Sequence, residues 1–72
     1  MIYELDNVYY LKTGSVYEIA NIEIKHNYVR NRNVLVISGS DSYQNFSEED
    51  EKKMNSYSFK ELESKILNVG GE

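Results

Sequence analysis

The first 40 residues alternate apolar with polar side chains and are broken at short intervals by turn residues, which restricts this half of the chain to an antiparallel sheet. The stretches IYEL and VYYLK are rich in β-branched and aromatic residues, and Asp6-Asn7 between them predicts a two-residue hairpin turn. KTGS at residues 12–15 predicts a second turn, in which the glycine takes a positive φ without steric cost. We therefore expect strands over about residues 2–38.

The segment VYEIANIEIKHNYV (16–29) is long for one strand, and its alternation changes phase. Apolar residues fall on odd positions before Ala20-Asn21 and on even positions after it, which predicts a β-bulge there, or a tight turn between two short strands. The polar run RNRN (30–33) predicts the next turn. VLVIS (34–38) is then almost continuously apolar, so we predict that it is the central, most buried strand.

Two helix starts follow a predicted loop at residues 38–46. Ser47, with Asp50 three residues later, predicts a helix N-terminus. The helix that it opens, EEDEKKM (48–54), has its acids first and its lysines last, as the helix dipole favours. It contains almost no apolar residues, so we expect a short, solvated helical turn.

The second helix start is a capping box formed by Ser58 and Glu61, with Tyr57 and Leu62 as a hydrophobic staple. Glu61 and Lys65 predict an ion pair one turn apart. Four apolar residues at helical spacing predict one amphipathic face: Phe59, Leu62, Ile66 and Val69. This face predicts a helix that packs on the apolar side of the sheet.

Gly70-Gly71 predicts the end of this helix, so the helical part spans about residues 47–69. The elements together predict a single α+β domain over residues 1–72. We expect a small, curled antiparallel β-meander of three to five strands, one C-terminal amphipathic helix packed on it, and a short acidic helical turn. A domain of this size buries only about 60% of the surface that its unfolded chain exposes.

Several classes of protein are excluded by composition and by missing motifs. The chain has no cysteine, which excludes a disulfide scaffold, a thiolate metal site and a cysteine nucleophile. MIYELDN is not a signal peptide, and no apolar run reaches the length of a membrane-spanning helix, so we expect a cytoplasmic protein with no membrane partner. No catalytic or phosphate-loop motif is present, so we expect no enzyme activity, no metal and no cofactor.

The net charge of −4 is unevenly distributed. Residues 1–40 contain equal numbers of acids and bases, whereas residues 41–72 contain eight acids and four lysines. We therefore expect an electrically bipolar molecule. One pole would be a hairpin in which Lys25, Arg30 and Arg32, with His26, surround Tyr28.

These cations and the tyrosine are the residue types that contact phosphate groups and stack on bases, so Lys25, Arg30 and Arg32 are a candidate anion-binding set. The alternative interpretation is a set of strand-end charges that keep the hairpin soluble and protect its edge. We do not expect direct nucleic-acid binding from a chain with a net charge of −4.

The other pole is the acidic run EEDE, which either occupies a basic groove of a partner or is simply a solvated first helical turn. The candidate acidic surface comprises Glu48, Glu49, Asp50, Glu51, Glu61 and Glu63. Tyr10, Tyr28 and Tyr43 are candidate aromatic anchors, because tyrosine is enriched at interface hot spots. The alternative for the seven tyrosines is an ordinary role as strand formers.

The leading functional hypothesis is a non-enzymatic protein that binds another protein through this acidic, tyrosine-rich surface. Small, cysteine-free, acidic α+β proteins resemble in type the inhibitors that phages use against host nucleases and defence proteins, which implies a host nucleic-acid enzyme as partner. The first alternative is an oligomeric module that sequesters a nucleotide or another small anion at the basic hairpin. The second alternative is a structural protein that self-associates through its bipolar charge.

Overall fold

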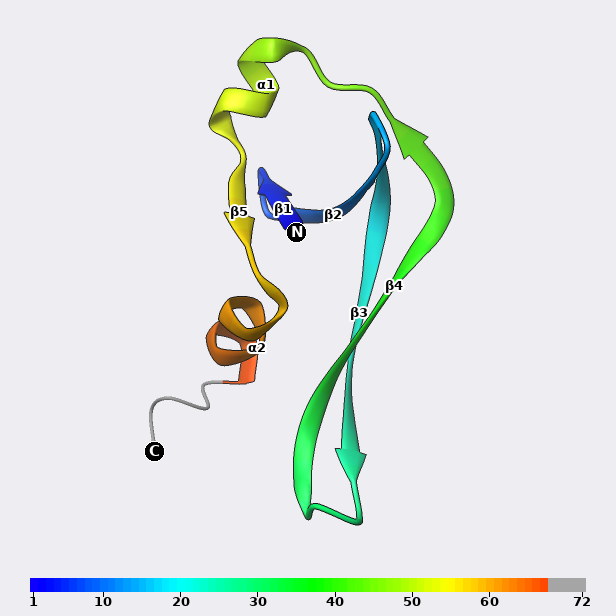
Figure 1. Ribbon diagram of the computed structural model, residues 1–72, viewed down its shortest axis with the longest axis vertical. Helices are drawn as coiled ribbons and strands as arrows, with labels where there is room; N and C mark the ends of the chain where they lie inside the picture. Colours follow the sequence, from blue (N-terminus) through cyan, green and yellow to red (C-terminus); the bar gives the residue numbers. More distant parts are fainter. Residues whose placement is uncertain (68–72) are drawn as a thin grey trace.

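The computed structural model describes residues 1–67 as one open, five-stranded antiparallel sheet with two short helices (Figure 1). The strands are β1 (Ile2–Leu5), β2 (Val8–Thr13), β3 (Val16–Asn27), β4 (Arg32–Gln44) and β5 (Asn55–Tyr57), and the helices are α1 (Glu48–Lys53) and α2 (Phe59–Leu67). The strand order is β4-β3-β2-β1-β5. The predicted α+β class, with an acidic helical turn and a C-terminal helix, is confirmed. The predicted contribution of Val69 and the helix end at Gly70-Gly71 lie outside the described residues.

Both predicted turns near the N-terminus are confirmed. Asp6 and Asn7 have φ angles of 50° and 69°, and Leu5 pairs with Val8 across them, which is the two-residue turn that matches the twist of a hairpin. Gly14, with φ of 62°, begins the turn between β2 and β3. These two turns arrange β1, β2 and β3 as consecutive neighbours in the sheet.

The predicted irregularity of the long strand is present, but most of it lies in the neighbouring strand. β3 is continuous, and its register with β4 shifts between Glu18 and Ala20. Glu18 pairs with Tyr43 and Ala20 with Gly39, so the extra residues are in β4. β4 therefore continues to Gln44, and the predicted loop over residues 38–46 is wrong. The polar composition of residues 38–44 suits the end of a strand whose two faces are both exposed to water.

The prediction that VLVIS is the central strand is also wrong, because β4 is an edge of the sheet. Leu35 in this run is buried, whereas Val36, on the opposite face, is 38% exposed. A continuous apolar run reports burial on two faces but says nothing about hydrogen-bonded neighbours on two sides. β1 is instead an interior strand, with β2 on one side and β5 on the other. β5 was not predicted from its sequence NSY.

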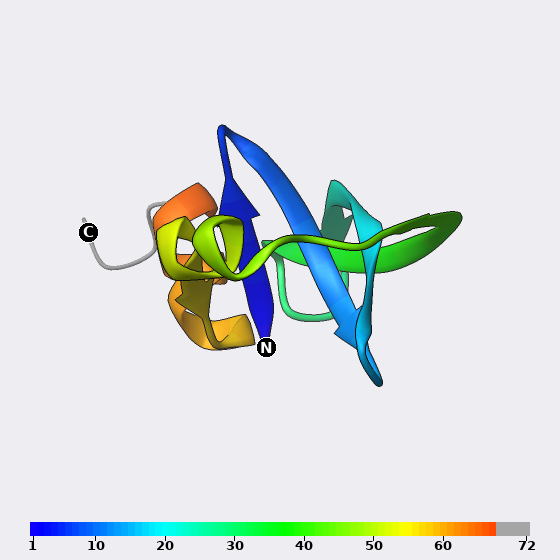
Figure 2. The same ribbon diagram turned by 90° about the horizontal axis from the view of Figure 1, so that it is seen from above.

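The apolar residues form separate clusters on the two faces of the sheet. On one face, Leu62 of α2 is fully buried against Ile2 and Leu35. The other face carries an edge-to-face aromatic cluster of Tyr3, Tyr10, Tyr17 and Phe46. Figure 2 shows the segment before α1 crossing above β2, which brings Phe46 onto this second face. α2 therefore covers the first face, and the segment before α1 covers part of the second.

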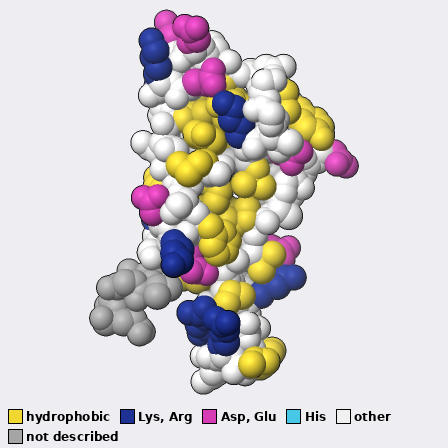
Figure 3. Space-filling view, viewed as in Figure 1, with side chains coloured by type: hydrophobic (Ala, Val, Ile, Leu, Met, Phe, Trp, Pro, Cys, Tyr) yellow, Lys and Arg dark blue, Asp and Glu magenta, His cyan; other side chains and the backbone are white. Residues whose placement is uncertain are grey.

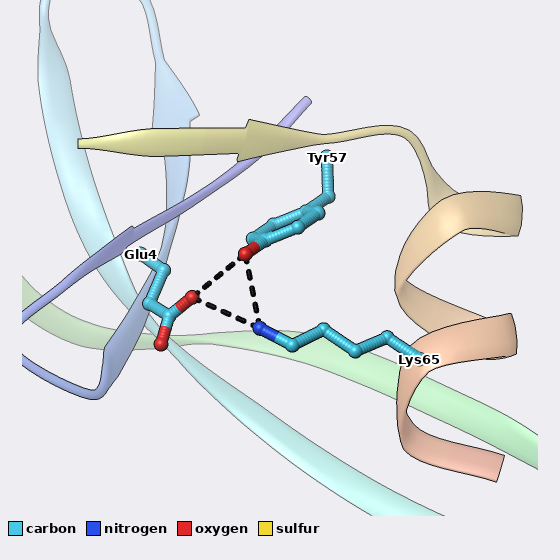
Figure 4. A network of polar contacts seen from close by, with 3 residues as sticks. All are labelled: Glu4, Tyr57 and Lys65. Atoms are coloured by element: carbon cyan, nitrogen blue, oxygen red, sulfur yellow. Dashed lines mark hydrogen bonds and ion pairs between the residues drawn. The ribbon is translucent and has the colours of Figure 1, made fainter. Parts of the chain in front are cut away.

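A polar contact fastens each helix to the sheet. The Tyr17 hydroxyl donates a hydrogen bond of 2.9 Å to Glu51 of α1. Burial, and next this hydrogen bond, raise the pKa of Tyr17 to about 12. On α2, Lys65 does not pair with Glu61 as predicted. Its ammonium reaches back to Glu4 of β1, with an Nζ–Oε1 distance of 3.2 Å (Figure 4).

Tyr57 completes the contact between α2 and the sheet. Its hydroxyl donates to Glu4 at 2.9 Å and accepts from the Lys65 ammonium at 2.9 Å. The Tyr57 hydrogen bond, supported by Lys65, holds the pKa of Glu4 below its ordinary value. The predicted capping box is confirmed, since Glu61 accepts from the backbone N–H of Ser58 at 2.9 Å. The start and the last turn of α2 are thus both held by side chains.

Leu62→Ala should destabilise the fold strongly, because the Leu62 side chain is 0% exposed and its removal leaves a cavity in the core. We expect a loss of about 2–5 kcal/mol in the free energy of unfolding, measured by urea denaturation. Phe59→Ala on the same helix is the matched control, since Phe59 is 46% exposed, and it should cost about 1 kcal/mol or less. Equal losses in the two variants would contradict this packing.

The fold should lose stability at alkaline pH through Tyr17. Its folded pKa lies above the unfolded value of 10.0, so its contribution is complete below that pH and disappears as the pH rises toward about 12. Tyr17→Phe should flatten this part of the curve of unfolding free energy against pH. Tyr28→Phe, at an exposed ring outside the cluster, should keep the wild-type slope, and a wild-type slope in Tyr17→Phe would refute the assignment.

Candidate functional site

The most exposed apolar residues of the described chain are at the tip of the β3–β4 hairpin. Tyr28 is 86% exposed and Val29 is 95% exposed. Figure 1 shows the hairpin projecting from the body of the sheet, so the tip stands clear of both helices. Ile24, in the arm of the hairpin, adds a further half-exposed apolar side chain. Apolar side chains presented on a protrusion are a common feature of protein-binding sites.

The tip is held in one conformation by its own polar residues. The Asn27 side chain accepts a hydrogen bond of 3.0 Å from the backbone N–H of Arg30, which closes the turn. Asn31 takes the left-handed conformation, with φ of 54°, that asparagine tolerates better than most residues. His26 and Asn33 are paired in the register, and Nδ1 of the histidine donates to the amide oxygen at 3.2 Å. These contacts reduce the entropy that binding would otherwise cost.

The Tyr28 ring is positioned by the same strand. It packs edge-to-face on His26, with ring centroids 4.7 Å apart. The predicted turn at residues 30–33 is displaced, because the turn comprises Tyr28 to Asn31 and Arg32 already pairs with Asn27. The position of this turn could have been predicted from two asparagines four residues apart. Asn27 is suited to close a turn, and Asn31 is suited to adopt a positive φ. Val29 belongs to the strand predicted over residues 16–29, so it was not predicted as a site residue.

Cations flank this apolar tip. Lys25, Arg30 and Arg32 are all exposed, and the register places Lys25 and Arg32 on the same face of the sheet. Lys25 makes an exposed ion pair of 3.4 Å with Glu23, which contributes little stability. The two arginines have no ion-pair partner within residues 1–67. Residues 21–38, the outer part of the hairpin, contain these three cations and one acid, Glu23, so this part has a net charge of +2. Figure 3 shows Lys and Arg side chains near the hairpin end of the molecule, with further Lys and Arg side chains toward the opposite end.

The acidic helix α1 lies at the other end of a molecule that is 41 Å long (Figure 1). Glu48, Glu49 and Glu51 are exposed, and Asp50 is half-buried. The backbone N–H of Asp50 donates to the N-cap hydroxyl of Ser47 at 3.2 Å, so these acids start the helix as predicted. The Glu51 carboxylate already accepts from Tyr17, and two lysines follow in the same helix, which reduces its net charge to −2.

The remaining predicted residues do not join α1 in one surface. Glu61 and Glu63 are on α2, which packs on the opposite face of the sheet from α1. Tyr10 is only 8% exposed, because Phe46 and Tyr17 cover its ring, so it is not an accessible anchor. Tyr43 is 61% exposed on β4. The predicted acidic, tyrosine-rich surface is therefore divided among four places: α1, α2, β4 and the hairpin tip.

Comparisons with protein-family models, curated proteins and solved structures find no match to this chain. Within residues 1–67, no helix is long and apolar enough to cross a membrane, and no three His, Cys, Asp or Glu side chains are grouped as metal ligands. The polar network of Glu4, Tyr57 and Lys65 (Figure 4) joins α2 to β1 and β5, so its role in holding the helix on the sheet accounts for it. The hairpin tip is the exposed feature that packing does not explain.

Asn27→Ala should loosen the tip without unfolding the domain, because it removes the acceptor of the Arg30 N–H from an exposed turn. We expect faster hydrogen exchange at the amide of Arg30 and a loss of about 1 kcal/mol or less in global stability. Asn21→Ala on β3 is the matched control, since the Asn21 side chain makes no hydrogen bond within residues 1–67. Unchanged exchange at Arg30 in the Asn27 variant would show that this contact does not order the turn.

Proposed function

We propose that this protein is a non-enzymatic binding protein that blocks a partner protein by inserting the tip of its β3–β4 hairpin. The observation that carries the proposal is the near-complete exposure of Tyr28 and Val29 on a tip ordered by three local contacts. Folding gains nothing from leaving these two side chains in water. A pocket that removes them from water gains their apolar area at little conformational cost.

The charges around the tip define the partner's chemistry. Arg30 and Arg32, together with Lys25, favour an apolar cleft with a rim of carboxylates. Metal-dependent nucleic-acid enzymes contain such carboxylates, because carboxylates hold their catalytic metal ions. A host nuclease or another nucleic-acid enzyme of the kind that phage inhibitors block is therefore the proposed class of target, with the hairpin cations directed at these carboxylates.

The acidic helix is a less favourable docking element than the hairpin. Its net charge is −2, Glu51 is engaged by Tyr17, and no exposed apolar anchor lies within α1. The partner-binding roles first expected for Glu48 to Glu51, Glu61 and Glu63 thus lack an apolar centre. Interfaces draw most of their affinity from such a centre, and surrounding charges mainly steer the approach.

Small-anion sequestration is the second candidate function, and it uses the same hairpin. Its support is the pair of arginines without ion-pair partners among the described residues, next to the open ring of Tyr28. Arginine binds phosphate through two parallel hydrogen bonds, and an exposed ring stacks on bases. This candidate predicts a higher melting temperature with nucleotides, and loss of that shift in Arg30→Ala/Arg32→Ala.

The deciding experiment compares three tagged forms of the chain as baits in nuclease-treated host lysate, with mass spectrometry as the readout. They are the wild type, a tip variant (Tyr28→Ser/Val29→Ser) and an acidic-helix variant (Glu48→Gln/Glu49→Gln). All four positions are exposed, so both variants should fold. We expect one protein captured by the wild type and by the acidic-helix variant, with binding to the tip variant at least about thirty-fold weaker.

The purified partner should then lose activity with the wild type and keep it with the tip variant. Capture that survives in the tip variant but fails in the acidic-helix variant would move the interface to α1. Signal that disappears with nuclease treatment, together with a nucleotide-dependent melting shift, would replace protein binding by the anion-binding candidate. No capture and no shift would refute both.

A further inference from the structure

The two edges of the sheet differ sharply. β5 is three residues long and lies between two helices, so it offers little backbone for pairing. β4 is thirteen residues long, and within residues 1–67 its backbone hydrogen bonds to a strand run only to β3. Natural edge strands are normally kept short, charged or interrupted by proline, because an open edge pairs with other strands. β4 has none of these protections over residues 33–40, which contain no charge and no proline.

This stretch is apolar on both faces. Val34, Leu35, Val36 and Ile37 alternate between the two faces, so a strand that pairs with β4 meets no charged side chain over these residues. We propose that β4 pairs antiparallel with β4 of a second copy of this chain, which makes a continuous ten-stranded sheet across a two-fold axis.

Three observations favour a second copy over another occupant. A two-fold contact uses the same segment twice, and β4 is the one long edge that the described chain offers. Val36 is at the centre of the uncharged residues 33–39, so a two-fold pairing centred on this segment places Val36 opposite its own copy. Antiparallel pairing also directs the outer part of each hairpin (residues 21–38, net charge +2) toward the α1 end of the other copy, where α1 has a net charge of −2. Parallel pairing would bring like charges together.

The test measures oligomeric state by sedimentation from about micromolar to about millimolar concentration. Wild type should pass from monomer to dimer over this range, and its amides between Asn33 and Gly39 should gain protection from hydrogen exchange as the dimer forms. Val36→Lys should weaken the dimer at least about thirty-fold by placing two lysines opposite each other. Glu23 on β3 lies directly opposite position 36 of β4, so the new lysine has a carboxylate partner in its own chain. The monomer should therefore stay folded.

Ser38→Lys, at an exposed position of the same edge, is a second disruptive variant and should also give a monomer. Asn21→Lys is the matched control, because Asn21 lies directly opposite Ser38 in the interior strand β3, and it should dimerise like the wild type. A wild-type monomer at every concentration overturns the proposal. So does a dimer that persists in both edge variants, or one that the tip variant Tyr28→Ser/Val29→Ser abolishes.

Discussion

The contact of Leu62 with Ile2 and Leu35 is the interaction on which the rest of the structure depends. It brings together the first strand, the β3–β4 hairpin and the last helix, which are far apart in the sequence. A two-stranded ribbon is only marginally stable by itself in water, and the hairpin extends beyond β2 as such a ribbon. Leu62 gives that ribbon an apolar surface to rest on. The projection of the tip, and any function built on it, therefore requires α2 to stay in place.

Much of the fold could be predicted because its signals are local. The Asp6-Asn7 turn, the capping box at Ser58 and Glu61, and the helix start at Ser47 each use residues within a few positions of one another. Two of the errors concern partners distant in the sequence. Lys65 reaches Glu4 instead of the residue one helical turn away, and VLVIS lies at an edge because β5, from the far end of the chain, adds to β1. Neither the Lys65–Glu4 contact nor the edge position of VLVIS can be predicted from the pattern of apolar and polar residues.

The candidate site was predictable in residue type and not in geometry. The sequence grouped the cations and Tyr28 correctly on one hairpin, since a hairpin is a local structure. It failed for Tyr10, because adjacent tyrosines in a strand point to opposite faces, and sequence alone does not show that Phe46 covers the second face. It also failed to separate the acids of α1 from those of α2. The distance between the two poles means that charge orients an approaching partner, while the apolar tip supplies affinity.

The two proposals constrain each other through the geometry of β4. The segment proposed to pair ends at Asn33, so dimerisation leaves Tyr28 and Val29 uncovered. Because the paired strands run in opposite directions, the two tips point away from each other, and one partner molecule cannot bind both across its own cleft. A dimer would therefore gain avidity only from a partner that is itself oligomeric or arrayed along a filament. Toward a monomeric partner, dimer and monomer would bind with the same intrinsic affinity per tip, so the edge variants Val36→Lys and Ser38→Lys should leave inhibition unchanged there. Against an oligomeric partner, the same two variants should inhibit less strongly than the wild type, because they have lost the avidity of the dimer.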